Sequence, residues 1–125
     1  MAAIAAITTG DLSQGNINSR DPFVVAGLDA DTTGNDTLKT GVTGKTIHIE
    51  KIFMNYFVDT GEQTVQINSG STAVFGPVTV SELAPQIFEY EFKYPIALAS
   101  GASLNIDVSA AFALYVLIEG FVTTD

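Results

Sequence analysis

Short runs in which apolar and polar residues alternate constrain the fold of this chain most. In the clearest run, IFEYEFKYP at residues 87–95, aromatic residues fall on one side and charged residues on the other. The aromatic side consists of Phe88, Tyr90, Phe92 and Tyr94, and the charged side of Glu89, Glu91 and Lys93. Successive side chains of a β-strand point to opposite faces, so this pattern predicts a half-buried strand with an aromatic inner face.

Runs of this kind recur along the chain, separated by clusters of Gly, Pro, Asn, Asp and Ser. Their spacing is typical of a β-sandwich or barrel, and no window sustains helical periodicity. We expect about eight strands, at residues 22–28, 37–40, 46–58, 64–70, 71–78, 87–95, 104–108 and 110–122. The chain is therefore predicted to be all-β, an antiparallel β-sandwich with the jelly roll as the favoured topology.

Two local features refine this prediction. The strand at residues 46–58 changes phase, because the apolar residues from Ile52 onward are one position out of step with Ile47 and Ile49. This slip predicts a β-bulge near residues 50–51, or burial of both faces. The strand at residues 71–78 is expected to stop at Gly76–Pro77, and residues 79–86 to form a loop or one helical turn.

The 125 residues are divided into an extended N-terminal arm, residues 1–20, and one β-sandwich domain, residues 21–125. The arm is rich in Ala at its start and then polar, with Gly10 and Gly15 as breakers. Arms of this composition usually fray unless their own sheet or a neighbour holds them.

The last expected strand is apolar on both faces between residues 111 and 118. The outer strand of a solvated sandwich normally alternates with polar residues. Either the arm or a loop covers the second face, or a symmetry-related copy does, because large apolar patches mark interfaces. The candidate interface residues are Ile4, Ala113, Tyr115, Leu117 and Phe121.

Composition argues against several function classes. Five basic residues face fourteen acidic ones, and the formal net charge is −9. Phosphate backbones and anionic membranes require clustered Lys and Arg, so we expect no direct nucleic-acid or membrane binding, whereas a basic protein partner fits. The chain has no cysteine, which removes disulfides, thiolate metal sites and Cys nucleophiles. It shows no signal peptide, and no apolar run approaches the roughly 18 residues of a spanning helix.

The stretch GVTGKT, residues 41–46, imitates the end of a phosphate-binding loop. A working loop reads G-x-x-x-x-G-K-[ST] and opens a helix, so that successive backbone amides surround the phosphates. Here Lys39 stands where the first glycine belongs, and an alternating β-branched run follows Thr46. We interpret the stretch as a turn that leads into a strand.

Residues 29–36, DADTTGND, imitate a calcium loop. Asp29, Asp31, Thr33 and Gly34 match positions 1, 3, 5 and 6 of the helix–loop–helix motif, but Thr40 replaces the acid of position 12. A polar turn whose side chains bond their own backbone is the favoured interpretation, and we expect no metal site.

No catalytic constellation stands out. Glu89 and Glu91 share one strand face, without an apolar pocket to raise either pKa, and the single histidine, His48, has no evident Ser or Asp partner. Exposed aromatics for glycan binding are also few, because the chain has no Trp. We therefore expect neither an enzyme nor a cofactor.

Residues 41–122 carry a connected series of strand and turn motifs. A Thr-Gly turn opens a strand of alternating isoleucines, TGKTIHIEKIF, and an SGST…GP turn follows. The segment YPIALASGASLNIDVS then leads to the last strand. In this pattern, about residues 41–122 resemble small β-sandwich structural proteins of tailed bacteriophages, and most of all head decoration, or cement, proteins.

This resemblance implies a virion protein made in the host cytoplasm and placed on the capsid exterior. Such proteins commonly form trimers that bind the major capsid protein lattice and stabilise it, and the interface residues named above would then serve oligomer or capsid contacts. The alternative is a jelly-roll module of a tail fibre or receptor-binding protein that binds host glycan through residues 29–36 or 76–86.

Overall fold

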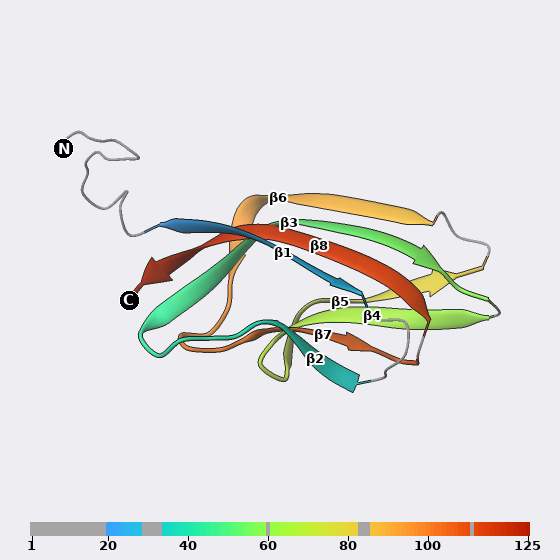
Figure 1. Cartoon of the computed structure of the whole chain (residues 1–125), viewed down its shortest axis with the longest axis horizontal. Helices are drawn as coiled ribbons and strands as arrows, with labels where there is room; N and C mark the ends of the chain where they lie inside the picture. Colours follow the sequence, from blue (N-terminus) through green and yellow to red (C-terminus); the bar gives the residue numbers. More distant parts are fainter. Residues whose placement is uncertain (1–19, 29–33, 60, 83–85, 111) are drawn as a thin grey trace.

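The computed structural model describes residues 20–28, 34–59, 61–82, 86–110 and 112–125, and these residues form an antiparallel β-sandwich. Two four-stranded sheets pack face to face, one above the other in Figure 1. The strands are β1 (Asp21–Leu28), β2 (Gly34–Lys39), β3 (Lys45–Phe57), β4 (Glu62–Ser69), β5 (Thr72–Ser81), β6 (Ile87–Ala97), β7 (Leu104–Val108) and β8 (Ala113–Thr124). The predicted all-β sandwich of about eight strands is confirmed.

The order of the strands in the two sheets shows how the chain folds back on itself. Sheet A has the order β1-β8-β3-β6, and sheet B has the order β2-β7-β4-β5. The first strand therefore pairs with the last, the second with the seventh, the third with the sixth and the fourth with the fifth. This is the pairing of one long antiparallel hairpin that is bent across two sheets.

The core lies between the sheets and is built from the alternating inner positions that the sequence indicates. Ile49, Ile52 and Ile118 from sheet A have no exposed surface, and neither has Leu104 from sheet B. Burying one such side chain contributes roughly 1.5–3 kcal/mol, so sheet A and sheet B hold each other in place through these contacts.

The predicted bulge in β3 is confirmed. The register of β3 against both of its neighbours shifts between Ile49 and Lys51, so Glu50 is the additional residue. Next to this bulge β8 carries Gly120, which pairs with Ile49. A Cβ atom at Gly120 would lie 1.9 Å from the carbonyl oxygen of His48, so only glycine allows this close approach.

The stretch that imitates a phosphate-binding loop is a turn that leads into a strand, as expected. Gly44 has a φ of 81°, in the left-handed region that favours glycine, and β3 begins at the next residue, Lys45. No helix follows this turn.

The prediction for β6 holds for three of its four aromatic residues. Phe88 and Phe92 pack against the core, and Tyr90, although 48% exposed, lies on the same inner side, since it pairs with the buried Ile52 and its ring centroid is 5.9 Å from that of Phe75 in β5. Tyr94 is the exception and is 76% exposed. It lies in residues 92–95, which face a single residue of β3 because the register of this edge strand jumps from Ile49↔Ile96 to Lys51↔Glu91.

The expected end of the fifth strand at Gly76–Pro77 is wrong. The strand β5 continues to Ser81, so part of the segment expected as a loop or helical turn is extended. Proline lacks a backbone N–H, but β5 is the edge strand of sheet B and tolerates Pro77 where a central strand would not.

A buried amide cluster pins the register of sheet B. Asn68 is 1% exposed; its Nδ2 donates to Asn35 Oδ1 at 2.9 Å, and its Oδ1 accepts from Gln66 Nε2 at 2.8 Å. The Nδ2 atoms of Asn35 and Asn105 both donate to the carbonyl oxygen of Gly70. These bonds link β2, β4 and β7 beside the turn after β4.

Replacing Asn68 by Ala is expected to lower the free energy of unfolding by about 2 kcal/mol, because this buried side chain loses two part-buried hydrogen bonds. Asn68→Asp should cost more, since it would place a carboxylate oxygen against the Oδ1 acceptor of Asn35. Urea unfolding checks both values. The exposed Asn55→Ala is the control, and equal effects at Asn55 and Asn68 would contradict the account.

Several predictions concern residues outside the described part of the chain. The N-terminal arm falls there apart from Arg20, as do candidate interface residue Ile4 and residues 29–33 of the calcium-like loop.

Candidate protein-contact surface

The outer face of sheet A carries apolar side chains on all four of its strands. Along β8 the side chains of Leu114, Val116 and Ile118 are buried, while Ala113 is exposed and Tyr115 and Leu117 are half-buried on the opposite side. The antiparallel register then decides which residues of β1, β3 and β6 stand beside them. We call the solvent-facing apolar side chains of this sheet the apolar outer face: Val24, Ala26, Phe53, Phe57, Ile87, Ala113, Tyr115 and Leu117.

One row of the apolar outer face crosses three strands. Leu117 pairs with Ala26 of β1 on one side and with Phe53 of β3 on the other. Directly opposed side chains in an antiparallel pair have Cβ atoms about 4.5–5.5 Å apart, so these three form a continuous strip.

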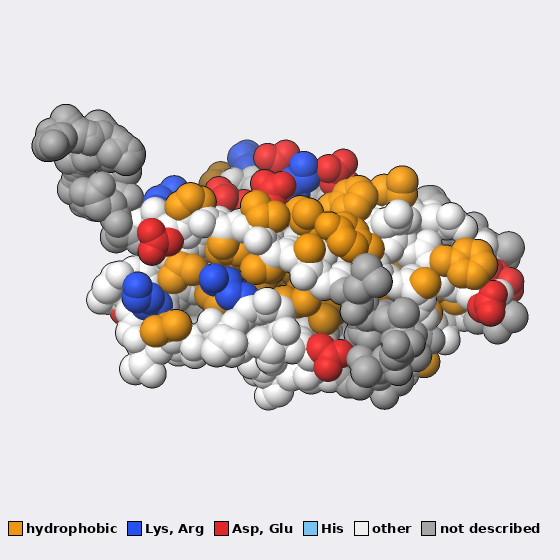
Figure 2. Space-filling model, viewed as in Figure 1, with side chains coloured by type: hydrophobic (Ala, Val, Ile, Leu, Met, Phe, Trp, Pro, Cys, Tyr) orange, Lys and Arg blue, Asp and Glu red, His pale blue; other side chains and the backbone are white. Residues whose placement is uncertain are grey.

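The neighbouring positions extend this strip. Tyr115 pairs with Asn55 of β3, which pairs in turn with Ile87 of β6, and Ala113 pairs with Phe57. Val24, Phe57 and Ile87 are 63%, 54% and 60% exposed, values unusual for large apolar side chains. Figure 2 shows hydrophobic side chains gathered over the strands of sheet A, with charged side chains beside them. Contiguous exposed apolar patches of this kind mark protein interaction surfaces.

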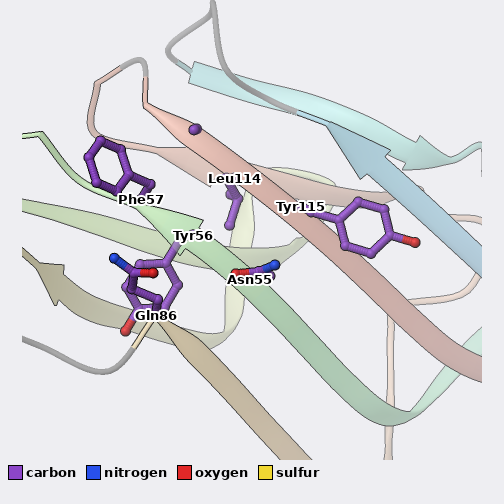
Figure 3. Close-up of a pocket in the computed structure, with 7 residues that line it drawn as sticks. Asn55, Tyr56, Phe57, Gln86, Leu114 and Tyr115 are labelled. Atoms are coloured by element: carbon purple, nitrogen blue, oxygen red, sulfur yellow. The ribbon is translucent and has the colours of Figure 1, made fainter.

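A pocket of about 250 Å³ lies at the end of the apolar outer face that contains Phe57 and Ala113. Figure 3 shows the rings of Phe57 and Tyr115 standing apart in this pocket, with the amides of Asn55 and Gln86 among the residues around them. The remaining lining comes from Tyr56, Ala113 and Leu114. The mixture of aromatic rings and neutral amides suits an apolar side chain or a short peptide segment better than an ion.

A charged row borders the apolar outer face. Glu119 of β8, Lys51 of β3 and Glu91 of β6 stand in register, and Lys51 Nζ lies 2.9 Å from a carboxylate oxygen of Glu89. The hydrogen bond to Glu89 and the charge of that carboxylate raise the pKa of Lys51. With one lysine among three glutamates the border is net acidic. Glu89 and Glu91 thus belong to a solvated strand face.

An aromatic stack occupies the far end of the same face. The rings of Phe121 and His48 stack with centroids 4.5 Å apart, and Arg20 Cζ lies 4.2 Å from the centroid of the Phe121 ring. Phe121 is therefore only 6% exposed, although its neighbours on the outer side of β8 are more accessible. Its contacts within the chain are already made, so Phe121 anchors Arg20 rather than offering free apolar surface.

His48 is half-buried in this stack, and its Nε2 lies 2.9 Å from Thr123 Oγ1. Burial lowers its pKa below the ordinary value of 6.5, the positive charge of Arg20 lowers it further, and the carboxylate of Asp125 partly opposes both effects. The side chain therefore favours the neutral form in the folded state.

This shift predicts a pH dependence of stability. A lowered folded-state pKa means that the unfolded chain binds the proton more tightly than the folded chain. The contribution of neutral His48 to the free energy of unfolding is therefore complete above pH 6.5 and is lost as the pH falls through the folded-state pKa. The melting temperature should fall over that window, and His48→Gln should remove this part of the decrease. Because His48 is the only histidine, proton NMR reports its pKa directly, and a value above 6.5 would contradict the stack.

Asp125 causes a second pH dependence of stability, at acidic pH. Hydrogen bonds from Ser100 and from Thr46 Oγ1, the latter at 2.6 Å, lower the pKa of its side-chain carboxyl below the ordinary 3.8. This contribution to stability is present above pH 3.8 and is lost as the pH falls through the folded-state pKa of Asp125.

The structure brings three of the five predicted interface residues together, namely Ala113, Tyr115 and Leu117. The sequence analysis missed the partners on neighbouring strands, which are Val24, Ala26, Phe53, Phe57 and Ile87. Phe53 and Phe57 fall on the outer side once the bulge near residue 50 is taken into account. The change in alternation after the bulge could therefore have identified these two residues from the sequence. Val24 and Ile87 become neighbours of the patch only through long-range strand pairing.

No protein-family model matches this chain, and no curated protein sequence matches it significantly. Within the described residues no group of three or more His, Cys, Asp or Glu side chains is placed to hold a metal ion. The part of the chain that the structure describes also contains no helix with the length and hydrophobicity needed to span a membrane.

Proposed function

We propose that this chain is a structural virion protein of a tailed bacteriophage, a head decoration protein that binds and stabilises the assembled capsid as an oligomer. The observation that carries the proposal is the apolar outer face of sheet A, a broad surface shaped for contact with another protein surface. The resemblance of residues 41–122 to phage decoration proteins supports the same conclusion.

The strand pairing supports the jelly-roll topology that the strand pattern of the sequence predicts. An eight-stranded jelly roll consists of two Greek keys, in which a long hairpin is bent across two sheets. The pairs β1–β8, β2–β7, β3–β6 and β4–β5 correspond to that arrangement. We therefore infer a jelly roll.

The physical mechanism of stabilisation is mass action. A protein that binds the assembled lattice, and not the separated capsid subunits, stabilises the lattice by its binding free energy. A trimer would contact three lattice positions at once and gain avidity if the geometry allows simultaneous contact. The net charge of −9 favours a shell surface with basic residues.

Thermal disruption of heads tests this function. Heads assembled without the protein should release their DNA at a higher temperature after the purified protein is added, and sedimentation should show the free protein as a trimer. A protein that leaves the disruption temperature unchanged and does not co-sediment with heads is not a decoration protein. Binding to a glycan array by such a protein would favour the receptor-binding alternative.

A further inference from the structure

We propose that a pocket between the edge strands β1 and β2 binds an organic carboxylate with an apolar group, and that Lys39 and Lys45 recognise the carboxylate. We call it the edge pocket. It shares no residue with the apolar outer face, so the inference does not depend on the proposed role in a virion. It rests on an apolar cavity, on two cationic side chains that line it, and on hydrogen bonds that hold its wall in place.

The edge pocket lies where the two sheets meet at one side of the sandwich. Strands β1 and β2 are edge strands of sheets A and B. They lie close together, because a Cβ atom at Gly27 of β1 would be 2.6 Å from Leu38 Cδ2 of β2. Near the start of β1, the segment that joins β2 to β3 leaves a cavity of about 210 Å³.

Much of the lining of the edge pocket is apolar. Phe23 and Val122 pack against the core from the inner side of sheet A, and Ile47 beside them is only 3% exposed. Val42 adds apolar surface from the segment after β2 and is 55% exposed. The volume is below the roughly 300–1,000 Å³ of sites for drug-sized ligands, so the edge pocket suits a single aliphatic or aromatic group.

Two half-buried lysines line the same cavity. Lys45 is two residues before Ile47 on β3 and therefore points to the same, inner side of sheet A. Lys39 ends β2, and its Nζ lies 5.0 Å from the centroid of the Phe23 ring. Among the described residues, no carboxylate forms an ion pair with either ammonium group.

The charge of the edge pocket is opposite to that of the chain as a whole. Asp21 is its one acidic lining residue, so two lysines leave an excess of one positive charge in a protein whose net charge is −9. A carboxylate would receive charge-assisted hydrogen bonds from the ammonium groups, whereas a neutral or cationic ligand would leave them unmatched. A ligand with one carboxylate and one apolar group therefore matches both parts of the lining.

Backbone hydrogen bonds hold the wall of the edge pocket without a ligand. The N–H of Lys45 donates to the carbonyl oxygen of Val42 at 3.0 Å and closes the turn before β3. The N–H of Gly41 donates to Ser103 Oγ at 2.8 Å. The N–H of Gly101 donates to the carbonyl oxygen of Lys45, also at 2.8 Å. These bonds fix the segment between β2 and β3 on the loop after β6, so binding would order little further backbone.

Titration of the ¹⁵N-labelled protein with 4-methylpentanoate, followed by two-dimensional NMR, tests this site. The probe carries one carboxylate and an aliphatic group of the size of a leucine side chain. We expect saturable shifts of the amide signals of Phe23, Val42 and Lys45, with a Kd of about 1 mM, as is usual for a ligand of this size. The neutral 4-methylpentanamide should bind about tenfold more weakly.

Substitutions assign the carboxylate to the two lysines. Lys39→Gln and Lys45→Gln should each raise the Kd about three- to tenfold, because each removes one ammonium group from the edge pocket. Lys93→Gln on β6, at the opposite edge of sheet A, changes the net charge equally and should alter the Kd less than about twofold. Val42→Asp, at an exposed position, should raise the Kd at least about tenfold by placing a negative charge at the pocket.

A free organic acid and the C-terminal residue of a peptide share this chemistry, and N-acetyl-leucine distinguishes them. Tighter binding of N-acetyl-leucine than of 4-methylpentanoate would support a peptide C-terminus as the ligand, and the reverse order would support a free acid. The proposal is overturned by equal affinity for the acid and its amide, or by an unchanged Kd in both pocket lysine variants. Absence of saturable shifts at these residues about tenfold above the expected Kd would also overturn it.

Discussion

Leu117→Asp is expected to convert the proposed oligomer to monomers and to leave the fold of the chain intact. Leu117 stands at the centre of the apolar outer face, between Ala26 of β1 and Phe53 of β3. Truncating a central apolar anchor of an interface typically costs about 2–4 kcal/mol of association free energy. The equivalent weakening of self-association is roughly 30- to 700-fold per contact, a change that sedimentation equilibrium resolves readily.

The fold should survive because the Leu117 side chain is half-buried on the outer side and is not part of the core between the sheets. The low strand propensity of Asp costs less than about 1 kcal/mol at such a position. Thr79→Asp on the outer side of sheet B is the matched control and should keep both the oligomer and the melting temperature. A folded Leu117→Asp protein that keeps the native mass would show that this face is not the contact surface, and one that unfolds would show that Leu117 contributes to the fold itself.

Gly120→Ala is expected to cause the largest loss of stability among the single substitutions considered, about 3 kcal/mol. A Cβ atom at this position would lie 1.9 Å from His48 O and 3.0 Å from Phe23 Cζ. The backbone oxygen cannot move aside without separating β8 from β3 at the bulge, and overpacking of this kind costs 1–3 kcal/mol or somewhat more. Urea unfolding measures the loss.

Gly44→Ala separates steric crowding from backbone strain. Gly44 has a positive φ, but a Cβ atom there would meet nothing within 4 Å. Its replacement should cost only the strain of a left-handed conformation, about 1 to 2 kcal/mol. If Gly120→Ala costs no more than Gly44→Ala, the close approach between β8 and β3 is not a constraint on the fold.

Much of the fold was predictable because it depends on local periodicity. The alternation of Ile47, Ile49 and Ile52 with its one-residue slip gave both the β3 strand and its bulge, since a change of phase has few other physical causes. The turn at Gly44 was predictable for a similar reason, because β-branched alternation after it excludes the helix that a phosphate-binding loop needs.

The errors arose where tertiary context decides the structure. Tyr94 shares the alternation of Phe88 and Phe92, but it lies where β6 leaves the regular pairing with β3. The extension of β5 past Pro77 likewise depends on its place at the edge of sheet B, and a single strand pattern carries no information on whether a neighbour is present.

The candidate surface was predictable on β8 alone. Two-sided hydrophobicity singled out Ala113, Tyr115 and Leu117, because the outer positions of a strand in a solvated sheet are normally polar. The contributions of Val24 and Ile87 depend on the pairs Val24↔Glu119 and Asn55↔Ile87, which join residues 95 and 32 positions apart. No local pattern encodes such a pairing.

The most direct test of the proposed function is the position of this protein in the particle. Antibody against the chain, coupled to gold, should be applied to intact particles of the phage that carries the gene and examined by electron microscopy. A head decoration protein predicts label over the whole head surface and none on the tail. Label confined to the tail or its fibres, or complete absence of the protein from purified particles, would contradict the account.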